Sequence, residues 1–286
     1  MTSTPVLTES TSASEPGRPV VPAVPDGHRW DRAGDAWGRR ALDWACLFEH
    51  YAIDVIVAMF DRLELQPGSK LLDVACGSGL AMRMADGLGA SVAGIDAAES
   101  LIEIARARTP EGDIRVGDMF DLPWADASFD AVTAVNGVWG GCEAALAEAF
   151  RVLRPGGRIG ISFWGHGHLD LRPCFQAFAE HAPPEHVAGM KRTNGIARPG
   201  VAESMLESVG FEVVERGGRM STLEWPDADT AWRAMASVGP AVPALERVGP
   251  DVLRPIVMER LDALRDAQGI YRFRNDHQFV IARRPS

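Results

Sequence analysis

The chain has 286 residues, of which 46% are hydrophobic and 24% charged, and its formal net charge at pH 7 is -10. This length is sufficient to bury a full core, in one domain or in one domain with an elaboration. A protein that binds nucleic acid needs a basic face, because neutralising phosphates supplies most of the affinity. The acidic balance therefore argues against nucleic-acid partners and against an anionic membrane surface.

Cysteine spacing and N-terminal composition indicate the cellular location. The four cysteines, at positions 46, 76, 142 and 174, are far apart, so we expect no disulfide framework, no bound metal and a reducing cytoplasm. No apolar run approaches the roughly 20 residues of a membrane helix. Residues 1–28 are rich in Pro, Ser, Thr and Ala, which predicts a disordered leader and not a secretory signal. Residues 29–286 are expected to form a single domain.

The first ordered segment, 30–66, is predicted to be helical. Apolar residues recur every three or four positions from 41 to 65, which predicts one long amphipathic helix. Trp30, Trp37 and Trp44 recur every seven residues, so a helix would place them on a shared face. The sequence Gln-Pro-Gly at 66–68 then stops the helix.

Short buried strands alternate with helices from residue 70 onward. Strands are predicted at 70–75, 91–96, 113–118, 129–135 and 158–164, with helices at 80–88, 98–108 and 143–153. This alternation over short loops predicts a parallel sheet covered on both faces. Beyond 164 we expect an irregular stretch, a helix at 200–209, a strand at 211–215, a helical insertion at 227–266 and a last strand at 277–282.

The most informative motif is the glycine-rich turn after the first strand. Gly77 and Gly79 allow a sharp turn and a close backbone approach to a ligand at the carboxyl end of that strand. Asp96 ends the second strand, where a carboxylate can accept hydrogen bonds from both hydroxyls of a ribose. Together these two features predict a nucleoside cofactor.

The residues after the turn separate the candidate nucleosides. A dinucleotide fingerprint has a third glycine three positions after the second, and this chain has Met82 there. The phosphate-binding Gly-Lys-Ser/Thr pattern is absent too, because Leu80 follows Gly79. A turn built for a ligand without phosphates favours S-adenosylmethionine over a nicotinamide cofactor.

Five motifs in order resemble those of class I S-adenosylmethionine-dependent methyltransferases, in particular the ubiquinone/menaquinone-biosynthesis-like branch that methylates diverse small molecules. They are the segment 73–79, Asp96, the segment 117–123, the strand at 129–132 and the turn at 153–157. One departure is Ala75, where the family usually has glycine. The resemblance implies a Rossmann-like, doubly wound, mostly parallel seven-stranded sheet. The cofactor-binding core would be 70–164, with a helical lid at 30–66 and substrate-side loops, a helical insertion and the last strands at 165–286.

The same resemblance implies which residues bind S-adenosyl-L-methionine. They are Asp73, Ala75, Gly77, Gly79, Asp96, Ala97, Asp118, Met119 and Asn136. Gly77 and Gly79 would line the methionine portion, with Asp73 oriented toward its amino group. Asp96 would bind the ribose, with Ala97 beside the adenine, and Asp118 and Met119 would contact the adenine. Asn136 would face the sulfonium end. Met119 as core filler and Asn136 as a turn former are the alternatives.

The expected reaction is direct displacement on the methyl carbon, with S-adenosyl-L-homocysteine as product and a small, partly hydrophobic metabolite as O-, C- or N-acceptor. A general base is needed only when the nucleophile arrives protonated. His166 and His168 follow the fifth strand, and they are either candidates for that base or part of a flexible polar loop.

Several aromatic residues are candidates for the wall of the substrate pocket, and large rings there favour an apolar or aromatic substrate. They are Trp37, Trp44, Tyr51, Trp139 and Trp164. Ordinary packing on the sheet is the alternative for the three from the helical segment. A non-catalytic cofactor-binding regulator and a nicotinamide-dependent oxidoreductase also stay open, and the oligomeric state is not indicated.

Overall fold

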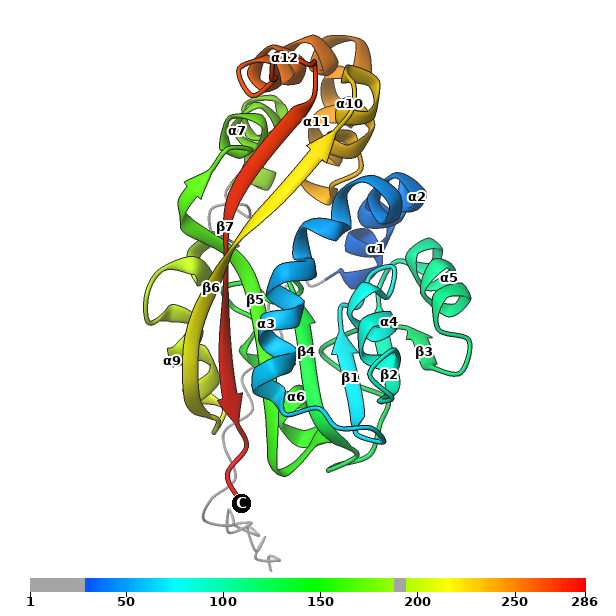
Figure 1. The fold of residues 1–286 in the computed structure, drawn as a ribbon, viewed down its shortest axis with the longest axis vertical. Coiled ribbons are helices and arrows are strands. Elements are labelled where there is room, and N and C mark those ends of the chain that lie inside the picture. The colour runs from blue at the N-terminus through cyan, green and yellow to red at the C-terminus, as the bar shows by residue number, and fades with distance from the viewer. Residues whose placement is uncertain (1–28, 188–193) are drawn as a thin grey trace, which may run out of the picture.

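The computed structural model describes residues 29–187 and 194–286, so the predicted leader at 1–28 lies outside the described residues (Figure 1). Its centre is a seven-stranded sheet in the order β3-β2-β1-β4-β5-β7-β6. The strands are β1 (Lys70–Val74), β2 (Ser91–Asp96), β3 (Asp113–Val116), β4 (Phe129–Val135), β5 (Leu153–Leu169), β6 (Glu212–Trp225) and β7 (Tyr271–Arg283). β1 to β5 pair in parallel, whereas β7 runs antiparallel to β5 and β6. The predicted Rossmann-like, mostly parallel sheet is confirmed.

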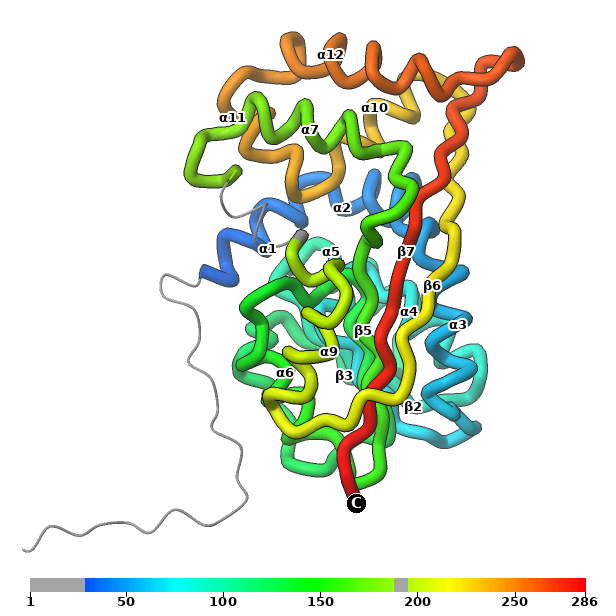
Figure 2. The backbone as a smooth tube through the Cα atoms, turned by 90° about the vertical axis from the view of Figure 1, so that its left-hand side faces the viewer, coloured from blue at the N-terminus to red at the C-terminus, as the bar shows by residue number. Residues whose placement is uncertain are grey.

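Helices cover both faces of this sheet. In Figure 2, α3 (Ile53–Leu63) and α4 (Leu80–Asp86) lie on one side, and α6 (Glu143–Val152) and α9 (Val201–Ser208) lie on the other. α5 (Glu99–Arg108) packs against β2 and β3, and the short 3-10 helix η3 (Asn194–Ala197) contacts β5. The neighbours Leu71 and Leu72 in β1 are both buried and belong to the two different cores. A strand buried on both faces needs such a continuous apolar run, which is why the pattern predicted it.

The prediction of one long helix over 41–65 is wrong. After α1 (Trp30–Gly38) the chain forms α2 (Ala41–Asp43), a π-helical turn η1 (Trp44–Phe48), a 3-10 turn η2 (Glu49–Ala52) and then α3. Distant side chains stabilise the irregular turns: Arg108 donates to the carbonyl of Ala45 (3.1 Å) and Trp225 to that of Leu47 (2.8 Å). Such partners satisfy backbone carbonyls that irregular helical turns leave exposed.

The last three strands are longer than predicted and carry a helical cap. The cap consists of α7 (Arg172–His181), α10 (Ala228–Ala236), η4 (Gly239–Ala241), α11 (Val242–Val248) and α12 (Pro250–Asp262), at the top of Figure 1. The insertion at 227–266 is thus helical as predicted, whereas the irregular stretch predicted after 164 contains α7. The predicted turn at 153–157 lies within β5 as an irregularity in its pairing with β4.

The extended halves of β6 and β7 were missed because charged residues alternate with apolar ones there. Tyr271 and Phe273 face inward, while Arg272 and Arg274 between them are exposed. The strand pattern therefore has a period of two, but its mean hydropathy is low. None of the helices in the described ranges is long and apolar enough to cross a membrane.

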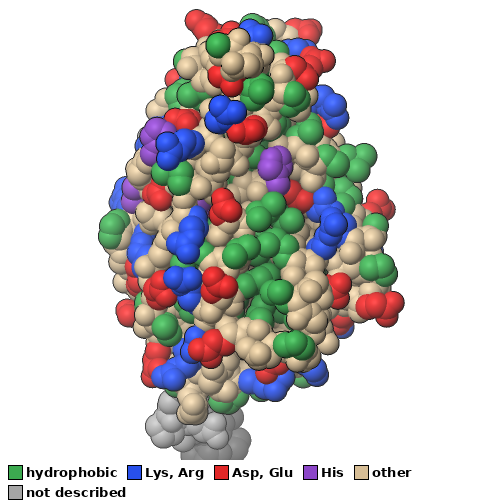
Figure 3. Space-filling model, in the orientation of Figure 1, with side chains coloured by type: hydrophobic (Ala, Val, Ile, Leu, Met, Phe, Trp, Pro, Cys, Tyr) green, Lys and Arg blue, Asp and Glu red, His purple; other side chains and the backbone are tan. Residues whose placement is uncertain are grey.

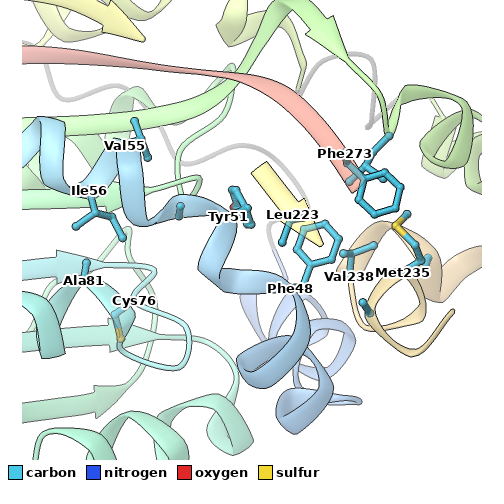
Figure 4. Close-up of a cluster of buried hydrophobic side chains, with 14 of the residues drawn as sticks. Phe48, Tyr51, Val55, Ile56, Cys76, Ala81, Leu223, Met235, Val238 and Phe273 are labelled. Atoms are coloured by element: carbon cyan, nitrogen blue, oxygen red, sulfur yellow. The ribbon is translucent and has the colours of Figure 1, made fainter. Parts of the chain in front are cut away.

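Trp225, at the end of β6, joins the cap, the strands and the N-terminal helices into one core. Its ring centroid lies 4.6 Å from that of Phe273 and 6.0 Å from that of Phe48. Figure 4 shows Phe48 and Phe273 with Leu223, Met235 and Val238 in the same cluster. Because the Trp225 ring contacts both Phe48 and Phe273 and shares one buried cluster with Met235 of the cap, the packing of the three parts is interdependent.

We expect Trp225→Ala to destabilise the protein by about 3–5 kcal/mol, since it leaves a cavity in this shared core. Trp225→Phe keeps the ring contacts but loses the hydrogen bond to Leu47, so it should cost only about 1–2 kcal/mol. Urea unfolding followed by fluorescence and by far-ultraviolet circular dichroism measures both. The control is Leu42→Ala at a 70% exposed position, expected within about 0.5 kcal/mol of the parent. Equal losses for Trp225→Ala and Leu42→Ala would contradict this account.

Candidate functional site

The glycine-rich turn after β1 lies at the carboxyl edge of the sheet, and its backbone is left-handed at Ala75 (φ 55°), Gly77 (φ 55°) and Gly79 (φ 82°). A Cβ atom on Gly79 would lie 2.9 Å from the Cβ of Ala105 in α5, so this glycine permits close helix packing. A Cβ on Gly77 would have one neighbour within 4 Å in the described parts of the chain, Nε1 of Trp44 at 3.8 Å. The space in front of Gly77 is therefore bounded by the N-terminal helices.

Ala75, the departure from the family pattern, is accommodated by the residue after Asn136. A Cβ on Gly137 would lie only 2.6 Å from the Cβ of Ala75, so the absent side chain makes room for the alanine methyl. This contact brings the end of β4 directly against the turn after β1. Asn136 and the glycine-rich turn consequently belong to the same edge of the sheet.

Asp96 is held by the backbone on both sides. Its Oδ2 accepts from the N–H of Gly77 and its Oδ1 accepts from the N–H of Ala98, each at 2.8 Å. Burial raises the pKa of the Asp96 carboxyl, and the backbone donors oppose that rise. Each carboxylate oxygen retains a further lone pair, so two hydroxyl donors of a ribose can still bind.

Asp73, in β1, is more deeply buried than Asp96, with 2% of its surface exposed. Its Oδ1 accepts a hydrogen bond from Oγ1 of Thr133 in β4 (2.7 Å). Burial raises the pKa of Asp73 to about 7, and the nearby Asp96 charge contributes to the rise. A carboxyl group that titrates near neutrality changes charge readily when a cation approaches it.

The N-terminal helices cover this edge as a lid, which we define as residues 30–52. Gly34 of α1 packs so closely on the backbone of Ala97 that a Cβ there would overlap the Ala97 carbonyl. Oγ of Ser100 donates to the carbonyl of Gly38 at 2.8 Å. The cap closes on the lid in turn, because Gly239 contacts the ring of Trp37.

A buried ion pair fastens the lid to the glycine-rich turn. Glu49, 6% exposed, accepts from Arg108 Nη1 (2.5 Å) and from the Oγ of Ser78 in the turn. Arg108 also donates to the Ser78 carbonyl at 3.1 Å. Burial raises the pKa of Glu49, while Ser78 and Arg108 oppose the rise. Sequence reasoning missed this cluster, since its members lie in three separate segments.

A second polar cluster lies among aromatic rings where the lid meets β4 and β7. The Nδ2 of Asn136 donates to the hydroxyl of Tyr51 (2.6 Å), and the Oδ1 of Asn136 is 3.0 Å from Nε2 of His277. The Tyr51 ring stacks on Trp164 at 4.4 Å, and Trp164 stacks on His277 at 5.1 Å. His277 was predicted only as part of a strand. The sequence feature that could have identified it is a polar residue on the inward face of that strand.

The other candidates occupy different surroundings. Met119 is buried in the core on the α6 side, and Trp139 packs partly buried against the same core. Asp118 accepts from the N–H of Phe120 at 3.0 Å. His166 and His168 are both exposed; His168 pairs with Asp170 (2.7 Å) and the His166 carbonyl accepts from Arg172 (3.2 Å). The catalytic role of these two histidines stays a prediction.

The doubly wound sheet, the turn beside Asp96 and the lid define a nucleoside-binding α/β protein. Comparison with known proteins identifies the family: residues 72–161 match the model of the methyltransferase domain. The chain is 30% identical to demethylmenaquinone methyltransferase of Renibacterium salmoninarum over 182 residues, which cover 63% of this chain and 69% of the relative. It is also 30% identical to nocamycin O-methyltransferase of Saccharothrix syringae, covering 60% of this chain and 69% of that one.

The fold comparison agrees with these matches. Phosphoethanolamine N-methyltransferase 2 of Haemonchus contortus, solved in complex with S-adenosyl-L-methionine, superposes with a TM-score of 0.56 at 18% identity. The superposition covers 92% of this chain and 61% of that one. The chain belongs to the class I S-adenosylmethionine-dependent methyltransferases.

The buried pair of Glu49 and Arg108 leads to a stability prediction. Arg108→Leu leaves the Glu49 charge buried without its cation and should cost about 3–5 kcal/mol. Adding Glu49→Gln to that variant should restore part of the loss, because the uncompensated charge is gone. Chemical denaturation at pH 7 measures both. The matched control is Arg272→Leu, which breaks an ion pair with Glu224 between side chains that are 48% and 53% exposed, at a cost below about 1 kcal/mol. A double variant less stable than Arg108→Leu alone would refute the explanation.

Proposed function

We propose that this methyltransferase transfers a methyl group from S-adenosyl-L-methionine to a small, partly hydrophobic metabolite at an O, C or N atom. The observation that carries the proposal is an aromatic wall at the carboxyl edge of the sheet, where Trp44 lies over Gly77 and the Tyr51 ring contacts both Trp44 and Trp164. Rings in such a place supply apolar contact area to a bound molecule. The names of the two relatives, a demethylmenaquinone and a nocamycin methyltransferase, support small-molecule acceptors.

The residues at the edge of the sheet fit the cofactor. A Cβ on Gly77 would meet only Nε1 of Trp44 among the described residues, at 3.8 Å, and Asp96 presents a carboxylate at the end of β2. We assign Asp96 to the ribose hydroxyls, Asp73 to the ammonium of the methionine portion, and Ala97 with Asp118 and Met119 to the adenine side. Gly79 and Ala75 shape the turn. When bound, S-adenosyl-L-methionine supplies a methyl group that its sulfonium makes electrophilic.

The protein's own contribution is alignment and exclusion of water. The lid and cap close over the carboxyl edge, so an acceptor enclosed there is held at a fixed orientation. Within this single domain, 70–164 would bind the cofactor, while 30–66 and 165–286 would face the acceptor. A base from His166 or His168 is required only for an acceptor that arrives protonated.

The charge distribution supports a small-molecule acceptor over nucleic acid. On the face in Figure 3, basic side chains alternate with acidic ones and hydrophobic side chains gather at the centre. Ile53 and Val57 of α3 are 40% and 48% exposed. The net charge of -10 adds to this argument.

Four cysteines without a disulfide among the described residues support a reducing cytoplasm as the site of action.

The first test is calorimetric titration with S-adenosyl-L-methionine and S-adenosyl-L-homocysteine. We expect micromolar binding by the parent and a loss of about 100-fold for Asp96→Ala, which removes charged hydrogen bonds to the ribose and to the turn. Asp54→Asn, at an exposed position of α3, should bind like the parent.

A second experiment measures methyl transfer, by following release of S-adenosyl-L-homocysteine with a panel of phenols, quinols, carboxylates and amines as acceptors. Cofactor binding without transfer to any of them would favour the regulatory alternative.

The raised pKa of Asp73 predicts a pH-dependent affinity. Its carboxyl is largely protonated below its pKa of about 7 in the free protein, and an ammonium beside it requires the ionised form. Affinity for S-adenosyl-L-homocysteine should therefore rise with pH, by up to about tenfold per unit below pH 7, with a proton released on binding. Calorimetry from pH 5.5 to 7.5 in buffers of different ionisation enthalpy measures this. Asp73→Asn should bind more weakly and lose the slope; an unchanged slope in that variant would assign it to another group.

A further inference from the structure

The chain of hydrogen bonds through His277 has a direction. The amide nitrogen Nδ2 of Asn136 can only donate, so the Tyr51 oxygen accepts from it. The amide oxygen Oδ1 can only accept, so His277 carries its proton on Nε2. Ser221 then donates its hydroxyl proton to Nδ1 of His277, at 3.2 Å. Ser221, His277, Asn136 and Tyr51 thus form an ordered series that ends at the tyrosine.

His277 has the properties that this series needs. It is 0% exposed, and burial lowers its pKa to about 3, so the imidazole stays neutral with one donor and one acceptor nitrogen. Its position on the inward face of β7 is fixed by pairing with Trp164 of β5 and Arg219 of β6. A neutral histidine on a rigid strand holds the Asn136 amide in one orientation.

The Tyr51 hydroxyl is left with a proton to donate. Its oxygen accepts from Asn136, and no side chain or carbonyl in the described parts of the chain accepts a hydrogen bond from it. Tyr51 is 3% exposed, and burial raises the pKa of its hydroxyl, which therefore stays protonated. A buried donor without an acceptor costs about 1–3 kcal/mol, a cost that a ligand oxygen would remove.

A second buried donor lies on the same face of β7. Nδ2 of Asn275, two positions before His277, has no hydrogen-bond partner among the described residues, and Asn275 is 1% exposed. Residues two apart in a strand share a face. The Tyr51 donor lies within the aromatic wall, and a second donor without an acceptor on the β7 face of His277 favours a ligand that carries oxygen on an apolar frame.

We propose that His277 is a positioning residue that orients Asn136 and, through it, the Tyr51 hydroxyl to donate to an oxygen of the methyl acceptor. This inference rests on the proposed function and narrows its substrate class to aromatic compounds that bear a phenolic or carbonyl oxygen. Trp164 and Trp44 flank the Tyr51 ring and would contact the apolar part of such a compound.

The test compares two probes, 2-naphthol and naphthalene, that differ by one hydroxyl. Titrations use the complex with S-adenosyl-L-homocysteine and follow tryptophan fluorescence, with naphthalene kept below its solubility. The parent should prefer 2-naphthol about five- to tenfold, as expected for one hydrogen bond. Tyr51→Phe and His277→Phe should each abolish the preference, and the double variant should lose nothing more, because both act through one hydroxyl. His277→Gln, which can place an amide N–H toward Asn136, should restore it.

A spectroscopic arm separates this role from a merely structural one. The chain has two tyrosines, so labelling of tyrosine Cζ with carbon-13 gives one signal for Tyr51 and one for Tyr271 as internal control. Adding 2-naphthol should shift the Tyr51 signal alone, and His277→Phe should remove that shift.

Three results would overturn the inference. They are a parent without preference for 2-naphthol, additive losses in the double variant, and a Tyr51 signal that responds to S-adenosyl-L-homocysteine but not to 2-naphthol. In each case intact S-adenosyl-L-homocysteine binding leaves the proposed function standing. Failure of the parent to bind S-adenosyl-L-homocysteine would instead refute the proposed function.

Discussion

The carboxylate of Glu49 is the constraint on which the arrangement of the site depends. A buried charge is tolerated only with a partner and hydrogen bonds, and Glu49 finds these in Arg108 at the end of α5 and Ser78 in the glycine-rich turn. Meeting that requirement ties the lid, the turn and α5 together. The position of Arg108 also accounts for the π-helical turn η1 just before Glu49, because Arg108 donates a hydrogen bond to the Ala45 carbonyl within that turn.

The long strand β6 provides a second attachment for the lid, in addition to the ion pair of Glu49 and Arg108. Trp225 of β6 donates to the Leu47 carbonyl, directly after the segment that Arg108 holds. The lid is therefore attached at two places: to α5 by the ion pair of Glu49 with Arg108, and to β6 by the Trp225 side chain. This double attachment keeps Trp44 over Gly77 and Tyr51 beside Asn136. The aromatic wall is in this sense a consequence of how the lid is anchored.

The cofactor core could be predicted from the sequence, and the acceptor side could not. Strands such as β1 and β2 are short apolar runs whose signal is local, and Asp96 is the last residue of β2. The break in the predicted helix over 41–65 depends on Arg108 and Trp225, which no local pattern relates to it. His277 continues the alternation that places Tyr271 and Phe273 inward, but its position opposite Trp164 and Arg219 emerges only from the register with β5 and β6.

The two aspartates at the edge of the sheet give an electrostatic reason for the choice of cofactor. Burial raises the pKa of both Asp73 and Asp96, and the Asp96 charge further opposes ionisation of Asp73. A ligand that brings a pyrophosphate would add negative charge beside these carboxylates and increase the free-energy cost of ionising them. A ligand with an ammonium and a sulfonium lowers that cost, because opposite charges nearby favour the ionised carboxylates. This electrostatic preference agrees with Met82, whose fully buried side chain occupies the position of the third glycine of a dinucleotide fingerprint.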